Sequence, residues 1–294
     1  IGPEAVLGIE LSPYAAELAR VTVWIGEIQW MLHHGFSVRD NPILRPLDTI
    51  QCRDALLEFT TENTENTEVG RAKQSVPDTS DPVGHGLAPF ARPTYQQPAT
   101  SDQQPREADW PAAEVIVGNP PFIGSQMMRS TLGDHTTDHL RSCFSGRLPS
   151  GTDLVTYWFE KARAQLESGK AQRAGLVATN SIRGGSNRKV LERIRESGEI
   201  FAAWSDEEWT VEGAAVRVSL VCFANNTSAP EMRRLDGKTV REIYADLTAE
   251  LDLTKAGRLK GNLGIAFQGP VKVGAFDIPG DLARQWLKQP NPHG

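Results

Sequence analysis

The sequence predicts an α/β fold in which a mostly parallel sheet is covered by helices on both faces. Short runs of aliphatic and β-branched residues alternate with longer amphipathic segments along most of the chain. Polar or acidic residues follow several of these short runs. Strands that alternate with helices favour a parallel sheet, because each helix returns the chain to the edge where the previous strand began. A chain of 294 residues is also long enough to bury a full core.

The first expected elements are a strand, a long helix and a second strand. Residues 5–10 form a short apolar run, which predicts the first strand. Ser12 then has the position of an N-cap, and Pro13 that of the first helical residue. The apolar stripe that follows predicts a helix to about His34. Residues 49–52 are expected to form the second strand.

A segment of different composition follows. Residues 58–108 contain Thr, Glu and Asn repeats and then sequence rich in Ser, Pro, Gln and Asp, with few large aliphatic side chains. Such a composition buries too little apolar surface to order itself. We therefore expect a disordered insertion or a long surface loop here, with order resuming near Trp110.

Strands and helices alternate again in the remainder of the chain. The expected helices are residues 153–166 and 188–196, and the expected strands are residues 115–118, 173–178, 200–204 and 217–223. After Asn225 the sequence becomes polar and irregular.

Residues 115–122, Val-Ile-Val-Gly-Asn-Pro-Pro-Phe, are the most informative stretch of the chain. A β-branched run ends in a loop that Pro120 and Pro121 stiffen, and neither proline has an N–H. The side-chain oxygen of Asn119 and the backbone carbonyls are then acceptors with few competing donors, and Phe122 adds a flat apolar face. This arrangement suits a planar group that is held through an exocyclic amine and stacked on an aromatic ring. The alternative is an ordinary turn, because Asn-Pro and Pro-Pro are common loop signals.

The chemistry of such an amine explains why acceptors are useful. An aromatic amine such as N6 of adenine is a poor nucleophile, because its lone pair is conjugated into the ring. Two acceptors aimed at its hydrogens favour the more pyramidal, nucleophilic form as charge develops.

Acidic residues follow the first two predicted strands. Glu10 could accept from both ribose hydroxyls of a nucleoside cofactor, and Asp54 could accept from an adenine amino group. Each could instead be an acid at the start of a helix. Ligands of open α/β sheets bind beyond the carboxyl ends of the strands, where Asn119 would also lie. Three such residues in series favour a ligand site.

Bulk composition describes an ordinary soluble protein. The net charge is −6 with a pI of about 5.6, which weighs against strong nucleic-acid binding by this chain alone. No apolar run is long enough to span a membrane and no secretory signal is present, so we expect a cytoplasmic protein without a membrane partner. The three cysteines are widely spaced. His135 and His139 could share a zinc ion, but no further ligands have motif spacing, so no metal is predicted.

Several segments resemble, in order, the motifs of amino-DNA methyltransferases, and in particular the adenine methyltransferases of the MmeI-like (type IIL) restriction-modification family. The similar segments are residues 8–20 with 24–30 (second motif), 52–56 (third motif), 118–122 (catalytic fourth motif), 175–185, 218–223 and 262–277. The resemblance covers residues 5–56 and 110–277.

The resemblance implies a Rossmann-like methyltransferase fold and transfer of a methyl group from S-adenosylmethionine to an adenine flipped out of double-stranded DNA. The catalytic residues would be Asn119, Pro120, Pro121 and Phe122. Asn119 and the Pro120 carbonyl would hold the amine, and Phe122 would stack on the base. Glu10 would bind the cofactor ribose and Asp54 the cofactor adenine, with Asn119 also beside the cofactor.

The sequence departs from the family pattern at both ends. The first strand and its Gly-rich motif, expected before Glu10, are missing, and so is most of the target-recognition domain expected after about residue 277. We therefore expect a catalytic core at residues 1–225 and, at residues 226–294, a connection towards the domain that would bind DNA. This chain alone is expected to bind S-adenosylmethionine poorly and to be weakly active or inactive.

Alternatives remain open at this point. Asn-Pro-Pro loops also serve methyltransferases that act on RNA adenine or on protein glutamine, because a carboxamide poses the same nucleophile problem. N4-cytosine methylation is another possibility, although Asn119 with Phe122 favours adenine. The last alternative is an inactive, DNA-binding remnant.

Overall fold

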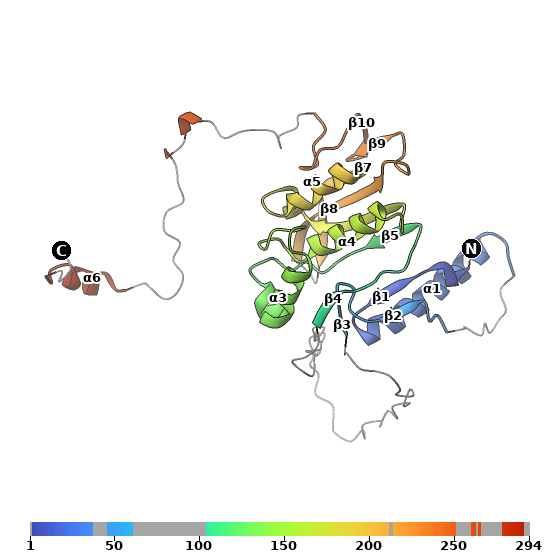
Figure 1. Cartoon of the computed structure of the whole chain (residues 1–294), viewed down its shortest axis with the longest axis horizontal. Coiled ribbons are helices and arrows are strands. Elements are labelled where there is room, and N and C mark those ends of the chain that lie inside the picture. The colour runs from blue at the N-terminus through green and yellow to red at the C-terminus, as the bar shows by residue number, and fades with distance from the viewer. Residues whose placement is uncertain are drawn as a thin grey trace, which may run out of the picture. The chain divides into compact units, whose positions relative to one another are not determined.

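The computed structural model describes residues 2–37, 46–60, 104–211, 214–250, 260–262, 264–265 and 278–290 (Figure 1). The chain divides into two units, Ile1–Thr254 and Lys255–Gly294. The second unit contains a short 3-10 helix, Lys260–Asn262, and the helix α6, Gly280–Trp286. All residues with a predicted role lie in the first unit.

The first unit begins with a small parallel pair of strands and a long helix. After a 3-10 turn at Pro3–Ala5, β1 (Gly8–Glu10) pairs with β2 (Ile50–Cys52). The first strand is therefore shorter than the predicted one. Helix α1 (Pro13–His33) lies between them in sequence, and the Ser12 hydroxyl accepts from the N–H of Ala15, which confirms the predicted N-cap.

A two-stranded antiparallel sheet follows. Strand β3 (Leu57–Thr60) pairs with β4 (Gln104–Glu107), with Thr60 opposite Gln104. The prediction of a disordered insertion or loop over residues 58–108 was therefore wrong at both ends, where backbone pairing with a distant segment decides the structure. Its middle, residues 61–103, lies outside the described residues.

The main sheet has six strands in the order β10–β9–β7–β8–β6–β5 (Figure 1). Their bounds are β5 Val115–Gly118, β6 Arg173–Thr179, β7 Gly198–Val211, β8 Ala214–Asn225, β9 Arg233–Leu235 and β10 Lys238–Val240. Two pairs are parallel, β5 with β6 and β7 with β9, and the other three are antiparallel. The fold is thus α/β with a mixed sheet, and the prediction of a mostly parallel sheet was wrong. Strands β7 and β8 are separated only by residues 212–213, and so short a connection permits only antiparallel pairing.

The helices that follow β5 are α2 (Met128–Leu132), α3 (Asp134–Cys143), α4 (Val155–Glu167) and α5 (Arg188–Ser197). Helices α4 and α5 share one core cluster with the main sheet, in which the rings of Phe159 and Phe223 stack with centroids 6.0 Å apart. On the face of β5 opposite Ile116, Val115 is 54% exposed and Val117 is 79% exposed. Within the described part of the chain, this face of β5 is therefore uncovered.

A second core cluster joins α2 and α3 to the two-stranded sheet and to α4. Phe144 of the chain after α3 packs edge-on against Tyr157 of α4, with ring centroids 5.0 Å apart, and Leu57 of β3 belongs to the same cluster. Helix α4 therefore packs on both clusters and holds the short sheet next to the long one.

Candidate active site

The Asn-Pro-Pro-Phe loop lies directly after β5, as predicted. Gly118 ends the strand opposite Leu176 of β6, and a Cβ at Gly118 would lie 3.2 Å from the Leu176 side chain, so the two strands approach closely. The Asn119 side chain is exposed, Pro120 is buried and Phe122 is half-buried. No hydrogen bond joins the Asn119 amide to another described residue. The loop therefore presents this amide to solvent on a fixed backbone.

Residues after the loop are held by the segment that opens α4. The carboxylate of Asp153 accepts from the N–H of Ser125 over 2.9 Å, and the N–H of Leu154 donates to the Ile123 carbonyl over 2.9 Å. Asp153 also contacts two side chains after β6, Ser181 and Asn187. Asp153 was not predicted as a site residue, because its partners are distant in sequence.

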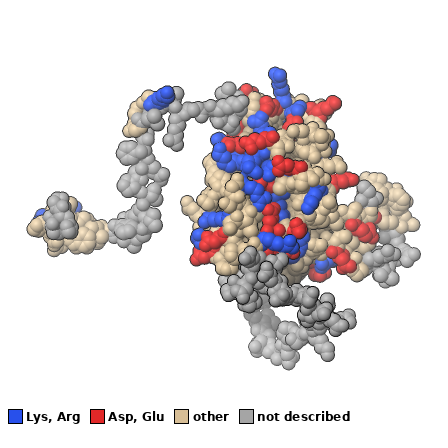
Figure 2. All heavy atoms as spheres, viewed as in Figure 1, with Lys and Arg blue, Asp and Glu red and all other residues tan. Residues whose placement is uncertain are grey.

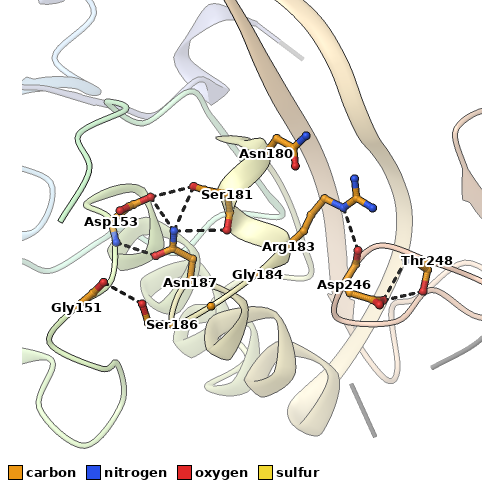
Figure 3. Close-up of a pocket in the computed structure, with 11 residues that line it drawn as sticks. Gly151, Asp153, Asn180, Ser181, Arg183, Gly184, Ser186, Asn187, Asp246 and Thr248 are labelled. Atoms are coloured by element: carbon orange, nitrogen blue, oxygen red, sulfur yellow. Dashed lines mark hydrogen bonds between the residues drawn. The ribbon is translucent and has the colours of Figure 1, made fainter. Parts of the chain in front are cut away.

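A pocket of about 640 Å³ lies beside this cluster (Figure 3). It is lined by three segments: the loop before α4, the turn between β6 and α5, and the chain near Asp246 and Thr248. Arg183 crosses it, donating from Nε to the Asp246 carbonyl over 3.0 Å. The pocket is open, its lining residues are polar residues and glycines, and it adjoins the residues that anchor the Asn-Pro-Pro-Phe loop.

Glu10 ends β1 and is partly buried. One of its carboxylate oxygens, Oε1, accepts from the N–H of Ser12 over 2.9 Å, and its backbone carbonyl accepts from the N–H of Arg53. Among the described residues, no partner contacts the other oxygen. The carboxylate is thus oriented by the backbone and retains an acceptor for a ligand.

Asp54 has a similar arrangement two residues after β2. Its Oδ1 accepts from the N–H groups of Leu56 over 2.7 Å and Leu57 over 3.2 Å. Burial raises the pKa of this carboxyl above its ordinary value, and the two backbone hydrogen bonds oppose that shift. The chain continues into β3 and not into a helix, so the helix-start alternative does not hold for Asp54.

The parallel register of β1 and β2 brings these two acids to the same end of the pair, since Glu10 lies opposite Cys52. Two hydrogen bonds join the Asp54 segment to the chain that leads into β5. Arg53 Nη2 donates to the Asp109 carbonyl over 2.6 Å, and Trp110 Nε1 donates to the Ala55 carbonyl over 2.7 Å. The segments that carry the predicted cofactor residues and the catalytic loop are therefore connected.

Lys161 of α4 strengthens this connection and was not predicted. Its ammonium group is buried, donates to the Ala108 carbonyl and to Glu107 Oε1, and lies 5.2 Å from the Trp110 ring centroid. Burial lowers the pKa of Lys161, whereas Glu107 opposes that shift. Its position on the same helical face as Leu154 and Tyr157 is the sequence signal that could have identified a buried lysine.

The rings of His135 and His139 lie edge to face, with centroids 4.0 Å apart. No group of three or more His, Cys, Asp or Glu residues suited to a metal ion occurs in the part of the chain that the structure describes. None of the helices described there is long and apolar enough to cross a membrane.

Comparison with known families identifies the chain. Residues 1–235 match the family described as MmeI, DNA-methyltransferase domain. The chain belongs to this family. The match includes β1, β2, the Asn-Pro-Pro-Phe loop and the main sheet up to β9, and it confirms the resemblance found in the sequence.

Two solved structures show weaker likeness. One is the type IIL restriction-modification enzyme MmeI in complex with DNA, with 26% identity over 48% of this chain and 20% of that chain, and a TM-score of 0.39. The other belongs to a type I restriction-modification system, with 16% identity over 48% of this chain and 28% of that chain, and a TM-score of 0.29. At these TM-scores neither likeness bears on the fold, and both matches span less than a third of the solved chains. No curated protein matches the chain.

Proposed function

We propose that this chain is the catalytic core of a DNA adenine N6-methyltransferase in a restriction-modification or phage-defence system. The observation that carries the proposal is the loop after β5, where the Asn119 amide is exposed on a backbone fixed by two prolines and by the residues that follow. Membership of the MmeI methyltransferase family supports the same reaction class.

The loop supplies two acceptors and a stacking face. The Asn119 side-chain oxygen and the Pro120 carbonyl would accept from the two hydrogens of N6, while Pro121 keeps the backbone free of a competing N–H. Phe122 is half-buried, so one ring face can pack on protein while the other stacks on a flipped base. The amine loses its proton to solvent after transfer, and no separate strong base is required.

Glu10 and Asp54 fit the nucleoside part of S-adenosylmethionine. Each carboxylate has one oxygen oriented by backbone N–H groups and a second oxygen without a partner among the described residues. Glu10 would accept from the ribose hydroxyls and Asp54 from the adenine amine. The cofactor supplies a methyl group activated by its sulfonium. Alignment of that methyl group with the amine held by Asn119 would account for much of the rate enhancement.

The edge of the main sheet supports a Rossmann-like arrangement. Strand β5 has only β6 as a neighbour among the described strands, which leaves its other edge without a partner strand there. A further parallel strand could pair along this edge, next to the catalytic loop.

Surface charge gives little support for DNA binding through α5. Basic and acidic side chains are interspersed on the face seen in Figure 2. In α5, Arg188 and Lys189 both pair with Glu192, and Arg195 pairs with Glu242. Each of these cations has an acidic partner, although Arg188 and Lys189 share one carboxylate, so the charge available for phosphates is reduced and not cancelled.

The test is nucleoside mass spectrometry on DNA from cells that express the natural reading frame encoding this chain. Asn119→Ala is the test variant, and Asn226→Ala, at an exposed turn after β8, is the matched control. We expect N6-methyladenine with the wild type and the control and none with Asn119→Ala. N4-methylcytosine would establish the cytosine alternative. Unmodified DNA from folded, expressed wild type would contradict the proposal and direct the same measurement to RNA and to protein glutamine.

A further inference from the structure

We propose that Asp153 is a positioning residue that sets the orientation of the Asn-Pro-Pro-Phe loop; this inference rests on the proposed function and deepens it. Both oxygens of the Asp153 carboxylate are used. Oδ1 accepts from the N–H of Ser125 over 2.9 Å. Oδ2 accepts from the Ser181 hydroxyl over 2.9 Å and from Nδ2 of Asn187 over 2.7 Å (Figure 3). The carboxylate therefore ties the chain after β5 to the chain after β6.

Asn187 completes a reciprocal pair with Asp153. The backbone N–H of Asp153 donates to Oδ1 of Asn187 over 2.8 Å, while Nδ2 of Asn187 donates back to the carboxylate. Asn187 is buried and lies directly before α5. Two hydrogen bonds between the same two residues fix both the position and the rotation of the carboxylate.

The contacts reach the proposed catalytic loop within one to three residues. Ile123 follows Phe122 directly, and its carbonyl accepts from the N–H of Leu154, the residue after Asp153. Ser125 is the next anchored position. At the other end, Gly118 is held in register by Leu176 of β6. The segment that carries Asn119 and Phe122 is thus fixed at both ends, and Asp153 provides the fixed point that is not part of the sheet.

A carboxylate is required at residue 153 because three donors converge on it. In Asp153→Asn, one amide oxygen remains for the Ser125 N–H, and the new NH₂ group faces the NH₂ group of Asn187 donor to donor. An unpaired donor beside the loop costs free energy that a shift of residues 123–125 would relieve. A shift of about 1 Å at reacting groups lowers rates by about 100-fold.

The first measurement is single-turnover methylation of DNA at saturating S-adenosylmethionine, using the natural reading frame. We expect Asp153→Asn to lower the single-turnover rate constant by about 100-fold. The cofactor dissociation constant, from equilibrium dialysis, should change by less than about twofold, because Glu10 and Asp54 do not contact this network.

A double variant tests the hydrogen-bond polarity. In Asp153→Asn combined with Asn187→Asp, the carboxylate and the amide exchange places, and each donor again faces an acceptor once the Ser181 hydroxyl turns from residue 153 to residue 187. We expect the double variant to recover to within about tenfold of the wild-type rate constant, whereas Asn187→Asp alone, which opposes two carboxylates, should not. Ser186→Ala removes only the hydrogen bond from Ser186 to the Gly151 carbonyl in the same pocket and should match the wild type.

Hydrogen–deuterium exchange over residues 119–127 provides a readout that does not require activity. Exchange at Ser125 should rise in Asp153→Asn and return towards the wild-type rate in the double variant. A wild-type rate constant and unchanged exchange in Asp153→Asn would overturn the inference, as would absence of any recovery in the double variant. If the wild type methylates no acceptor while Asp153→Asn still raises exchange, the positioning role stands and the proposed function fails.

Discussion

The region of β1, α1 and β2 buries far less apolar surface than the region of the main sheet. Its buried cluster consists of Ala16, Leu47 and Ile50, and Ala16 is the one fully buried residue of the 21-residue helix α1. In contrast, the cluster under the main sheet takes buried side chains from α4, α5 and strands β6, β7 and β8. Apolar side chains of α1 point to solvent within the described structure. They are Tyr14, Leu18, Val21, Ile25, Trp30 and Leu32.

This difference separates the two halves of the proposed site. Glu10 belongs to the weakly packed region, and Asp54 lies between that region and the second core cluster, whose Leu56 and Leu57 donate to it. Asn119 and Asp153 belong to or adjoin the well-packed region. Helices gain most of their stability in proteins from tertiary packing. A ligand that binds only the folded form stabilises that form. We therefore expect cofactor binding to stabilise the first region more than the second.

The largest expected effect is a loss of stability in the main core. Phe159→Ala removes a fully buried ring that stacks on Phe223 and should lower the free energy of unfolding by about 3–5 kcal/mol. The same change at Phe36, which is 53% exposed after α1 and stacks on Trp30, should cost less, about 0.5–1.5 kcal/mol. Urea unfolding of both variants measures the two losses in the free energy of unfolding. Equal losses would show that the two regions are packed alike.

The next effect is on cofactor affinity. Glu10→Gln retains an acceptor for the Ser12 N–H and replaces a charged acceptor for ribose with a neutral amide. Affinity for S-adenosylmethionine should fall by about tenfold, the difference between charged and neutral hydrogen bonds, while the rate at saturation is retained. Glu17→Gln, at an exposed position on α1 paired with Arg20, is the control in equilibrium dialysis. A loss of rate with unchanged cofactor affinity would indicate that Glu10 contacts the methylated substrate and not the cofactor.

A smaller effect is the pH dependence of that affinity. An ionised Asp54 accepts from an adenine amine more strongly than the protonated acid does, and burial raises its pKa. Affinity should therefore decline on acidification through a pKa above the ordinary 3.8, and Asp54→Asn should remove this dependence. The contribution of Asp54 to folding stability changes with pH in the opposite direction. Folding favours the protonated form, so the stabilising contribution of Asp54 is full below its unfolded pKa and lost as pH rises through the folded pKa. Equilibrium dialysis across the acid range measures the change in cofactor affinity, and urea unfolding over the same range measures the change in the free energy of unfolding.

The smallest effect concerns the exposed side of α1. Leu18 and Ile25 are about half exposed, so Leu18→Gln with Ile25→Gln should change the free energy of unfolding by less than about 0.5 kcal/mol. Ala16→Gln, on the buried side of the same helix, is the contrasting variant and should destabilise through overpacking. Thermal unfolding of the two variants compares the exposed and buried faces of α1. A large loss of stability in the Leu18→Gln, Ile25→Gln variant would indicate that the exposed face is covered in solution.

Local signals allowed much of the fold to be predicted. The cap at Ser12, strand β6 and helix α4 follow from neighbouring residues, and all three were confirmed. Strand order was not predictable in this way, because the pairing of β8 between β6 and β7 depends on partners far along the chain. The same limit explains the absence of Asp153 from the predicted site, since it binds residues 28 and 34 positions away. The roles of Glu10, Asp54 and Asn119 stay predictions.

The β3–β4 pair is a suitable insertion site in this domain. Thr60 and Gln104 face each other across the pair, so the two ends of whatever lies between them are already adjacent. Chain added there costs only about 0.6 kcal/mol for each doubling of loop length. The hydrogen bonds that join the Asp54 segment to the chain before β5 lie outside the insertion point. A reporter domain with neighbouring termini could be grafted at this point, giving a methyltransferase core that carries its own label.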